Sequence, residues 1–119
     1  DIAALAERLH GAPYVWGGRS GHGLDCSGLV QLVLGLHGLA APRDSDQQQL
    51  VLGRTLNAGE TLQRNDLVFF PGHVGIMVDG ENMVHANSAW MAVSTEPLAD
   101  AVARFEDDNP ILACRRLDG

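Results

Sequence analysis

Cys26 is the residue of this chain whose position most suggests chemistry. It follows Asp25, a residue type that caps helices, and it opens an apolar segment that predicts a helix from about Cys26 to His37. A thiol in the first turn of a helix faces unpaired N–H groups and the positive end of the helix dipole, which lower its pKa and make it nucleophilic. Cysteine is also a frequent core residue, which is the competing interpretation. The small Ser27 and Gly28 leave room for a substrate and favour the nucleophile.

A nucleophilic thiol needs a base, and two of the five histidines, His73 and His85, fall in segments that predict the strands of one β-hairpin. A three-residue loop at 79–81 would place His85 opposite Gly75, so that the two histidines become diagonal neighbours on one face of the sheet. A two-residue turn at 79–80 would put them on opposite faces. Gly75 would leave space above the sheet between the two imidazoles.

With both histidines on one face, His73 is the predicted base. His85 would orient it through a hydrogen bond at the far ring nitrogen, and Asn87, on the same face, is the alternative for that task. The competing interpretation is that both histidines pack in the core and bond to backbone groups. A zinc site is a further alternative, because Cys26, His73 and His85 could supply three ligands. The sequence contains no C-x-x-C, H-x-H or H-E-x-x-H element, so the indication of zinc is weak.

The elements that must position these residues predict an α+β fold with an antiparallel sheet, because helices come first and short strands follow. Apolar residues repeat at helical spacing over 2–10, and a glycine-rich loop follows over 11–25. Ser45 and Gln48 match a capping box at the start of a short helix. The predicted strands are short runs rich in Val, Ile and Phe, at 67–70, 74–78, 83–86, 93–96 and 111–117.

Length and charge exclude several classes of protein. The 119 residues fit one domain, 1–119, and the start at Asp1 without Met or signal peptide indicates a domain excised from a longer chain. A formal net charge of −7 argues against nucleic acid and anionic membranes as partners. No apolar run approaches the roughly 20 residues of a membrane span. Two cysteines are too few for a disulfide scaffold, and Cys114 is expected to be a buried core residue.

Six short motifs along the chain together resemble those of the NlpC-type cysteine peptidases of bacterial cell walls. They occur in the same order in that family, with compatible gaps, and the resemblance covers the chain from about Gly11 to Leu98. The motifs are Pro-Tyr-Val-Trp-Gly-Gly at 13–18, Asp-Cys-Ser-Gly at 25–28, Pro-Arg-Asp-Ser at 42–45 followed by Gln48, Asn-Asp-Leu-Val-Phe-Phe at 65–70, His-Val-Gly-Ile at 73–76 and Val-His-Ala at 84–86.

The resemblance implies a papain-like α+β fold, in which N-terminal helices pack on an antiparallel five- to six-stranded sheet. It also implies hydrolysis of the γ-D-glutamyl–diaminopimelate (or Lys) bond in peptidoglycan stem peptides. By the matching positions, Cys26 is the nucleophile, His73 the base and His85 the third polar member. The reaction would pass through a thioester and need neither metal nor organic cofactor.

Three further residues, Tyr14, Asp25 and Ser27, match positions that line the family's pocket for the N-terminal L-Ala of the stem peptide. Asp25 would there pair with the free α-amine. Elementary chemistry offers each a second role: Asp25 as a helix cap, Tyr14 as a hydrophobic anchor, and Ser27 as a residue of small size. Arg19 or Arg43 could bind a carboxylate of the substrate.

The chain departs from the family pattern at two positions. Asp44 stands where the family often has Thr, and Asn65 stands before Asp66 where Gly is usual. Asn tolerates left-handed backbone geometry, so the turn at Asn65 is expected to survive.

The implied partner is a peptidoglycan stem peptide of the L-Ala-γ-D-Glu-diaminopimelate type. The implied location is the cell envelope, periplasmic or secreted, with cytoplasmic peptide recycling as the alternative. Two other functions remain open: an inert cell-wall-binding module on the same fold, and an amidase or acyltransferase that uses the same thiol. The intact set of Cys26, His73 and His85 argues against the inert module.

Overall fold

Six strands form one antiparallel sheet in the computed structural model, which describes residues 1–14, 19–20, 23–57, 59–87, 91–105 and 110–117. The predicted strands are confirmed to within a few residues, and the additional one, β3, is too short to produce an alternating pattern. In their order across the sheet, the strands are β3 (Arg54–Thr55), β8 (Ala113–Arg116), β4 (Leu67–Phe70), β5 (His73–Met77), β6 (Asn82–Asn87) and β7 (Ala92–Pro97).

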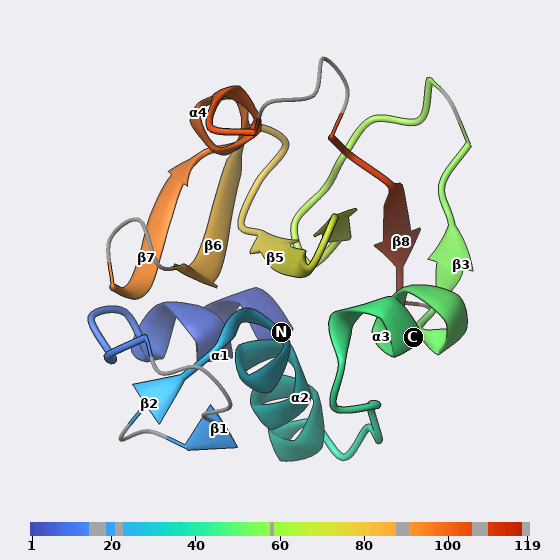
Figure 1. Cartoon of the computed structure of the whole chain (residues 1–119). Helices are drawn as coiled ribbons and strands as arrows, with labels where there is room; N and C mark the ends of the chain where they lie inside the picture. The colour runs from blue at the N-terminus through green and yellow to red at the C-terminus, as the bar shows by residue number, and fades with distance from the viewer. Residues whose placement is uncertain (15–18, 21–22, 58, 88–90, 106–109, 118–119) are drawn as a thin grey trace.

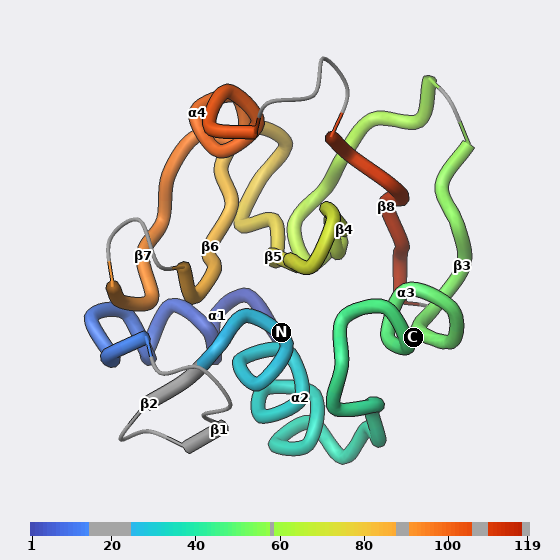
Figure 2. The backbone as a smooth tube through the Cα atoms, viewed as in Figure 1, coloured from blue at the N-terminus to red at the C-terminus, as the bar shows by residue number. Residues whose placement is uncertain are grey.

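The sheet order differs from the chain order at one place only. The last strand, β8, lies between β3 and β4, so the end of the described chain returns to a place one strand in from the edge of the sheet (Figure 2). From β4 to β7 the strands follow the sequence as a meander.

The first two helices, α1 (Ile2–Arg8) and α2 (Cys26–Leu36), cover one face of the sheet. Figure 1 shows both of them below the sheet. Their apolar residues pack with inward-facing strand residues such as Leu67, Phe69 and Ile76 in one buried cluster. Burial of this face removes a large apolar area from water, which is the main force that holds the helices on the sheet.

The opposite face carries a smaller apolar cluster and a helix that the sequence pattern did not predict, α4 (Leu98–Ala103). Val68 and Phe70 of β4 point to this side, so all four residues of β4 are buried. A strand covered on both faces shows a continuous apolar run instead of alternation. The glycine-rich segment predicted as a loop holds the short strands β1 (Arg19–Ser20) and β2 (Gly23–Leu24), which form a separate ribbon.

The hairpin of β5 and β6 has the three-residue loop at 79–81, the alternative that puts both histidines on one face, and not the two-residue turn. Val78 donates its N–H to the Asn82 carbonyl at 2.9 Å, and Ile76 pairs with Val84. The Asp79 carboxylate accepts the N–H groups of Glu81, the last loop residue, and of Asn82, the first residue of β6, and so holds the loop closed. The prediction of space above Gly75 is wrong, because the Met83 side chain occupies the place where a Cβ of residue 75 would lie.

Local conformations at Asn65 and Ser45 test two smaller predictions. Asn65 has φ +78°, the left-handed geometry expected of a glycine position, and its side chain also accepts the Ala3 N–H at 2.9 Å. The capping box at Ser45 is wrong: α3 (Ser45–Val51) begins after Asp44, which makes no side-chain cap. The amide of Gln48 instead turns inward and donates to the carbonyls of Ser27 and Pro42.

Candidate functional site

Cys26 is the first residue of α2 and lies buried between that helix and the sheet, with 7% of its surface exposed. The Asp25 carboxylate caps the helix by accepting the Gly28 N–H at 2.7 Å. The Cys26 thiol donates weakly to the Gly72 carbonyl, at 3.8 Å.

The Cys26 thiol has a raised pKa, against the expectation from its helix position. Burial is the largest cause, and the negative charge of Asp25 acts in the same direction. Backbone groups of Val74, Ser27 and Cys26 lower the pKa but do not compensate. The helix N-terminus is therefore outweighed by the loss of solvent around the sulfur.

His73 and His85 point at each other from neighbouring strands. His73 Nε2 lies 2.7 Å from His85 Nδ1, and the two rings meet edge to face. The predicted contact between His85 and the far ring nitrogen of His73 is thus present, and the hairpin loop is its cause. Asn87 contacts His85 and not His73, since its Nδ2 lies 3.3 Å from His85 Nε2.

Burial also sets the ionisation of both imidazoles. The pKa of His73 falls to about 3, because burial disfavours the charged ring and His85 and Arg104 add to the effect, while Glu96 opposes it. Burial likewise lowers the pKa of His85, although its hydrogen bond with Glu96 acts in the opposite direction. Both rings are therefore neutral at pH 7.

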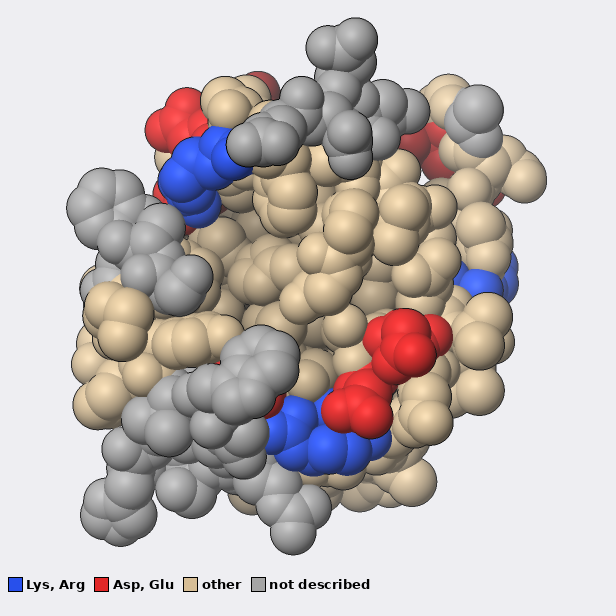
Figure 3. Space-filling view, in the orientation of Figure 1, with Lys and Arg blue, Asp and Glu red and all other residues tan. Residues whose placement is uncertain are grey.

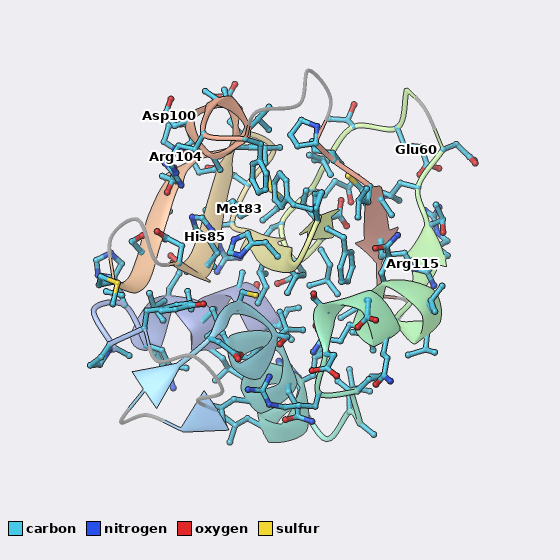
Figure 4. The ribbon with its side chains drawn as sticks, viewed as in Figure 1. Glu60, Met83, His85, Asp100, Arg104 and Arg115 are labelled. Atoms are coloured by element: carbon cyan, nitrogen blue, oxygen red, sulfur yellow. The ribbon has the colours of Figure 1, made fainter. Side chains whose placement is uncertain are left out.

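Sequence reasoning missed Glu96 and Arg104, which continue the line of contacts behind His85. Glu96 Oε2 lies 3.0 Å from His85 Nε2, and Arg104 donates to both Glu96 oxygens, at 2.6 and 2.8 Å. Figure 4 shows His85 on the sheet and Arg104 above it at the end of α4. A glutamate inside a predicted strand was the available signal, but its partner depends on the register of β6 against β7 and on an unpredicted helix.

The Glu96 carboxylate is ionised despite its burial. Burial alone would raise its pKa, but the hydrogen bonds from Arg104 and His85 outweigh that effect and lower the pKa to about 2. The side chain of Glu96 is 9% exposed and that of Arg104 is 37% exposed. The pair thus places a fixed negative charge next to His85.

Two hollows meet at Cys26 and Gly72. Figure 3 shows the hollowed face of the molecule, with charged side chains at its rim. The first hollow, of about 520 Å³, is bordered by α2, the segment 43–46 and Phe70. The second, of about 390 Å³, contains His73 and His85 and is bordered by Arg104 and Phe105.

The first hollow contains Asp25 and Ser27, and both contact Arg43. Arg43 binds the Asp25 carboxylate through two nitrogens, at 3.0 and 2.8 Å, and also donates to Ser27 Oγ at 2.9 Å. Gln48 holds this arrangement together, because its amide ties α3 to the backbone at Pro42 and Ser27. Asp25, which could attract a substrate amine, and Arg43, which could attract a substrate carboxylate, are therefore already paired with each other.

Tyr14 lines the second hollow together with Cys26, and not the first with Asp25. Burial raises the pKa of its hydroxyl, and the nearby Cys26 and Asp25 add to the shift. The structure thus brings Tyr14, Cys26, His73 and His85 to one hollow, and Asp25 and Ser27 to the adjoining one. The side chain of Arg19 lies outside the described residues.

The His73–His85 bond also bears on the zinc alternative. The nitrogens at 2.7 Å point toward each other and not toward a shared ion. Among the described residues, no three His, Cys, Asp or Glu side chains gather closely enough to hold a metal ion. None of the described helices has the length and apolar character to span a bilayer.

Comparison with known sequences gives a consistent family. The sequence model of the NlpC/P60 family matches residues 11–104. A γ-D-glutamyl-L-lysine dipeptidyl-peptidase of Bacillus cereus is 35% identical over 106 residues, which cover 82% of this chain and 31% of that protein. The probable peptidoglycan endopeptidase LytE of Bacillus subtilis is 32% identical over 108 residues, which cover 79% of this chain and 29% of that protein. The chain thus spans about a third of the length of these curated relatives.

Solved structures share the same fold. An NlpC/P60 family protein from Bacillus cereus superposes with a TM-score of 0.81 at 30% identity, covering 98% of this chain and 39% of that chain. RipD from Mycobacterium tuberculosis, described as a non-catalytic NlpC/p60 domain protein adapted to peptidoglycan binding, has a TM-score of 0.76 at 24% identity and covers 98% and 95%. The second likeness shows the fold alone.

Proposed function

Because this chain belongs to the NlpC/P60 family, we propose that it carries a cysteine peptidase that cleaves peptidoglycan stem peptides after γ-D-glutamate, before diaminopimelate or lysine. The observation that carries the proposal is the second hollow, where Cys26 and His73 lie together and His73 is held by His85 at 2.7 Å. The relatives named as γ-D-glutamyl-L-lysine dipeptidyl-peptidase and peptidoglycan endopeptidase support the substrate class.

The thiol and the imidazole begin the reaction as a neutral pair. The pKa of Cys26 is raised and that of His73 is about 3, so neither is charged at pH 7. His73 then acts as a general base, which takes the thiol proton while the sulfur attacks the γ-carbonyl carbon of D-glutamate. The carbonyl oxygen becomes an oxyanion, for which the Cys26 N–H at the start of α2 is a donor.

Collapse of the tetrahedral intermediate completes acylation. The protonated His73 gives its proton to the departing amine, the C–N bond breaks, and a thioester to Cys26 remains. Water then attacks the thioester carbonyl while His73 takes one of its protons, the C–S bond breaks, and the same proton goes to the departing sulfur. The γ-carboxylic acid is released and ionises in solution. The chemistry needs neither metal nor organic cofactor.

The two hollows would accommodate the two sides of the scissile bond. The first hollow takes the L-Ala-γ-D-Glu side, where Asp25 and Ser27 are the proposed binding residues, and Tyr14 borders the reacting carbonyl from the second hollow. The Asp25 carboxylate already accepts from Gly28, Ser27 and two nitrogens of Arg43, so a substrate amine would share Oδ2 with Arg43 or displace it. The peptidoglycan endopeptidases among the relatives support a location in the cell envelope, with cytoplasmic recycling of free stem peptides as the alternative.

The test is cleavage of L-Ala-γ-D-Glu-diaminopimelate, its lysine analogue and their N-acetylated forms, followed by mass spectrometry with and without a chelator. Chelator-insensitive cleavage after γ-D-glutamate is expected, lost in Cys26→Ala and retained in Cys114→Ala, which removes the other cysteine. Cleavage of another bond would indicate an amidase, and new acyl products an acyltransferase. Binding without cleavage, with an unreactive Cys26, would indicate a wall-binding module.

A further inference from the structure

Two buried or half-buried groups behind His85, Glu96 and Arg104, take no part in the steps above. They come from β7 and from the residue that ends α4, and they reach His85 on the side away from His73. His85 is 1% exposed, so its ring nitrogens cannot exchange these partners for water. The four side chains form a line of hydrogen bonds in the order Arg104, Glu96, His85 and His73. Which atom donates in each bond is therefore fixed by these four groups and not by water.

The direction follows from the two groups whose roles are unambiguous. Arg104 can only donate, and the ionised Glu96 can only accept. At 3.0 Å from Glu96 Oε2, His85 Nε2 must carry a hydrogen, because two acceptors at that distance would repel each other. A neutral His85 with hydrogen on Nε2 has a bare Nδ1, which must accept from His73 Nε2 at 2.7 Å.

The same reasoning applies to the ring of His73. A neutral His73 that donates from Nε2 has no hydrogen on Nδ1. His73 Nδ1 forms no hydrogen bond with any residue in the described ranges, and His73 lines one hollow with Cys26. The ring nitrogen left for the thiol is thus an acceptor, as a general base requires.

We propose that Glu96, held by Arg104, is a positioning residue that sets the tautomers of His85 and His73 and so keeps His73 Nδ1 ready to accept the Cys26 proton. The proposal rests on the peptidase function proposed above. The role is one of orientation and not of net charge, because the positive charge of Arg104 outweighs the negative charge of Glu96 at His73. Arg104 keeps Glu96 ionised and in place through two hydrogen bonds.

Asn87 is the competitor of Glu96 for His85 Nε2. Its Nδ2 lies at 3.3 Å from that nitrogen and also donates to Ser94 Oγ at 3.1 Å. If Asn87 donated to Nε2, the tautomers of both histidines would reverse, and His73 Nδ1 would carry a hydrogen. The shorter contact with a charged acceptor favours Glu96. When Glu96 is replaced by a side chain without an acceptor, donation from Asn87 to His85 Nε2 would favour the reversed tautomers.

The experiment compares two substitutions of Glu96 by side chains of similar length. Glu96→Gln keeps an oxygen that can accept from His85, whereas Glu96→Met keeps none. Imidazole ¹⁵N chemical shifts at pH 8 report the tautomers directly, without any substrate. We expect hydrogen on Nε2 of both histidines in the unmodified protein and in Glu96→Gln, and mixed or reversed tautomers in Glu96→Met.

Peptide cleavage supplies the kinetic readout. Glu96→Met is expected to lower kcat/KM by about 100-fold, as loss of a group that fixes a catalytic histidine does, with the larger part in kcat. Glu96→Gln should retain at least about ten times the activity of Glu96→Met. Glu81→Gln, an exposed change on the neighbouring turn, is the activity control. Arg104→Met breaks the same ion pair but leaves the acceptor, so it should keep the tautomers.

Three outcomes would overturn the proposal: hydrogen on Nδ1 of either histidine in the unmodified protein, unchanged tautomers in Glu96→Met, or equal activity in Glu96→Met and Glu96→Gln. The first can be observed even if a variant fails to fold. If the unmodified protein shows the expected tautomers and Glu96→Met loses them, but no stem peptide is cleaved, the peptidase function fails while the role of Glu96 stands.

Discussion

Two arginine–carboxylate pairs flank the candidate site, Asp25 with Arg43 beside the thiol and Glu96 with Arg104 beside the imidazoles. In each pair a buried carboxylate accepts from two nitrogens of a partly exposed arginine. The pairs differ in what else the carboxylate touches. Asp25 caps the helix that carries Cys26, whereas Glu96 binds a histidine.

The difference has opposite electrostatic consequences for the two reacting groups. The charge of Asp25 raises the pKa of Cys26 and so disfavours the thiolate. The charge of Glu96 acts to raise the pKa of His73 and so favours the imidazolium. Arg104, however, lowers the pKa of His73 by more than Glu96 raises it, so the opposite signs belong to the two carboxylates and not to the two ion pairs as wholes.

The largest expected effect concerns the imidazole side and acid stability. An unfolded histidine binds a proton near pH 6.5, whereas folded His73 does so only near pH 3, so the unfolded state binds more protons in between. The free energy of unfolding should therefore fall as the pH falls from about 6.5 to 3, with a slope of up to about 1.4 kcal/mol per pH unit. Urea denaturation across this range measures it. In His73→Gln the slope should be shallower, and an unchanged slope would contradict the assignment.

The next largest effect is a loss of folding stability when Asp25, beside the thiol, is replaced. Asp25→Ala removes the acceptor of the Gly28 N–H and of both Arg43 nitrogens, and should lower the free energy of unfolding by about 3 kcal/mol. Asp46→Ala, an exposed acid on the rim of the same hollow, should change it by less than about 0.5 kcal/mol. If urea denaturation gave equal losses of unfolding free energy for the two variants, the hydrogen bonds of Asp25 would contribute nothing to stability.

The smallest effect tests the opposite signs directly. Asp25→Asn keeps an oxygen for the helix cap but removes the charge, so the pKa of Cys26 should fall. Alkylation of Cys26 by iodoacetamide at pH 7, measured in a Cys114→Ala background, should become roughly three to ten times faster. Slower alkylation would contradict the role given to Asp25. Glu96→Gln should not accelerate the same reaction.

Sequence reasoning succeeded where local chemistry decides the outcome. The turn residues predicted a hairpin here with a loop of two or three residues, and the three-residue loop at 79–81 brings His73 and His85 to one face. The left-handed turn at Asn65 and the start of α2 after Asp25 are equally local. The ordered motifs then supplied the family, because a set of spacings carries more information than any single residue.

The failures involve burial depth and packing between separate elements. The pKa of Cys26 depends on how deeply the sheet buries it, which no local pattern contains. Gln48 satisfies carbonyls of another segment instead of capping its own helix, and Met83 fills the space above Gly75. The contact of Glu96 with His85 requires the strand register, and its contact with Arg104 requires a six-residue helix.

The place of β8 between β3 and β4 has a consequence for synthesis on the ribosome. Residues 67–69 of β4 pair with residues 113–115, so the six-stranded sheet cannot be completed until β8 has emerged from the ribosome. Until then the nascent chain presents one edge of β4, whose four residues are all apolar, to any strand it meets. Chaperone protection should therefore be needed during the interval in which about 40 residues are added, at ribosomal rates of roughly 5–20 residues per second.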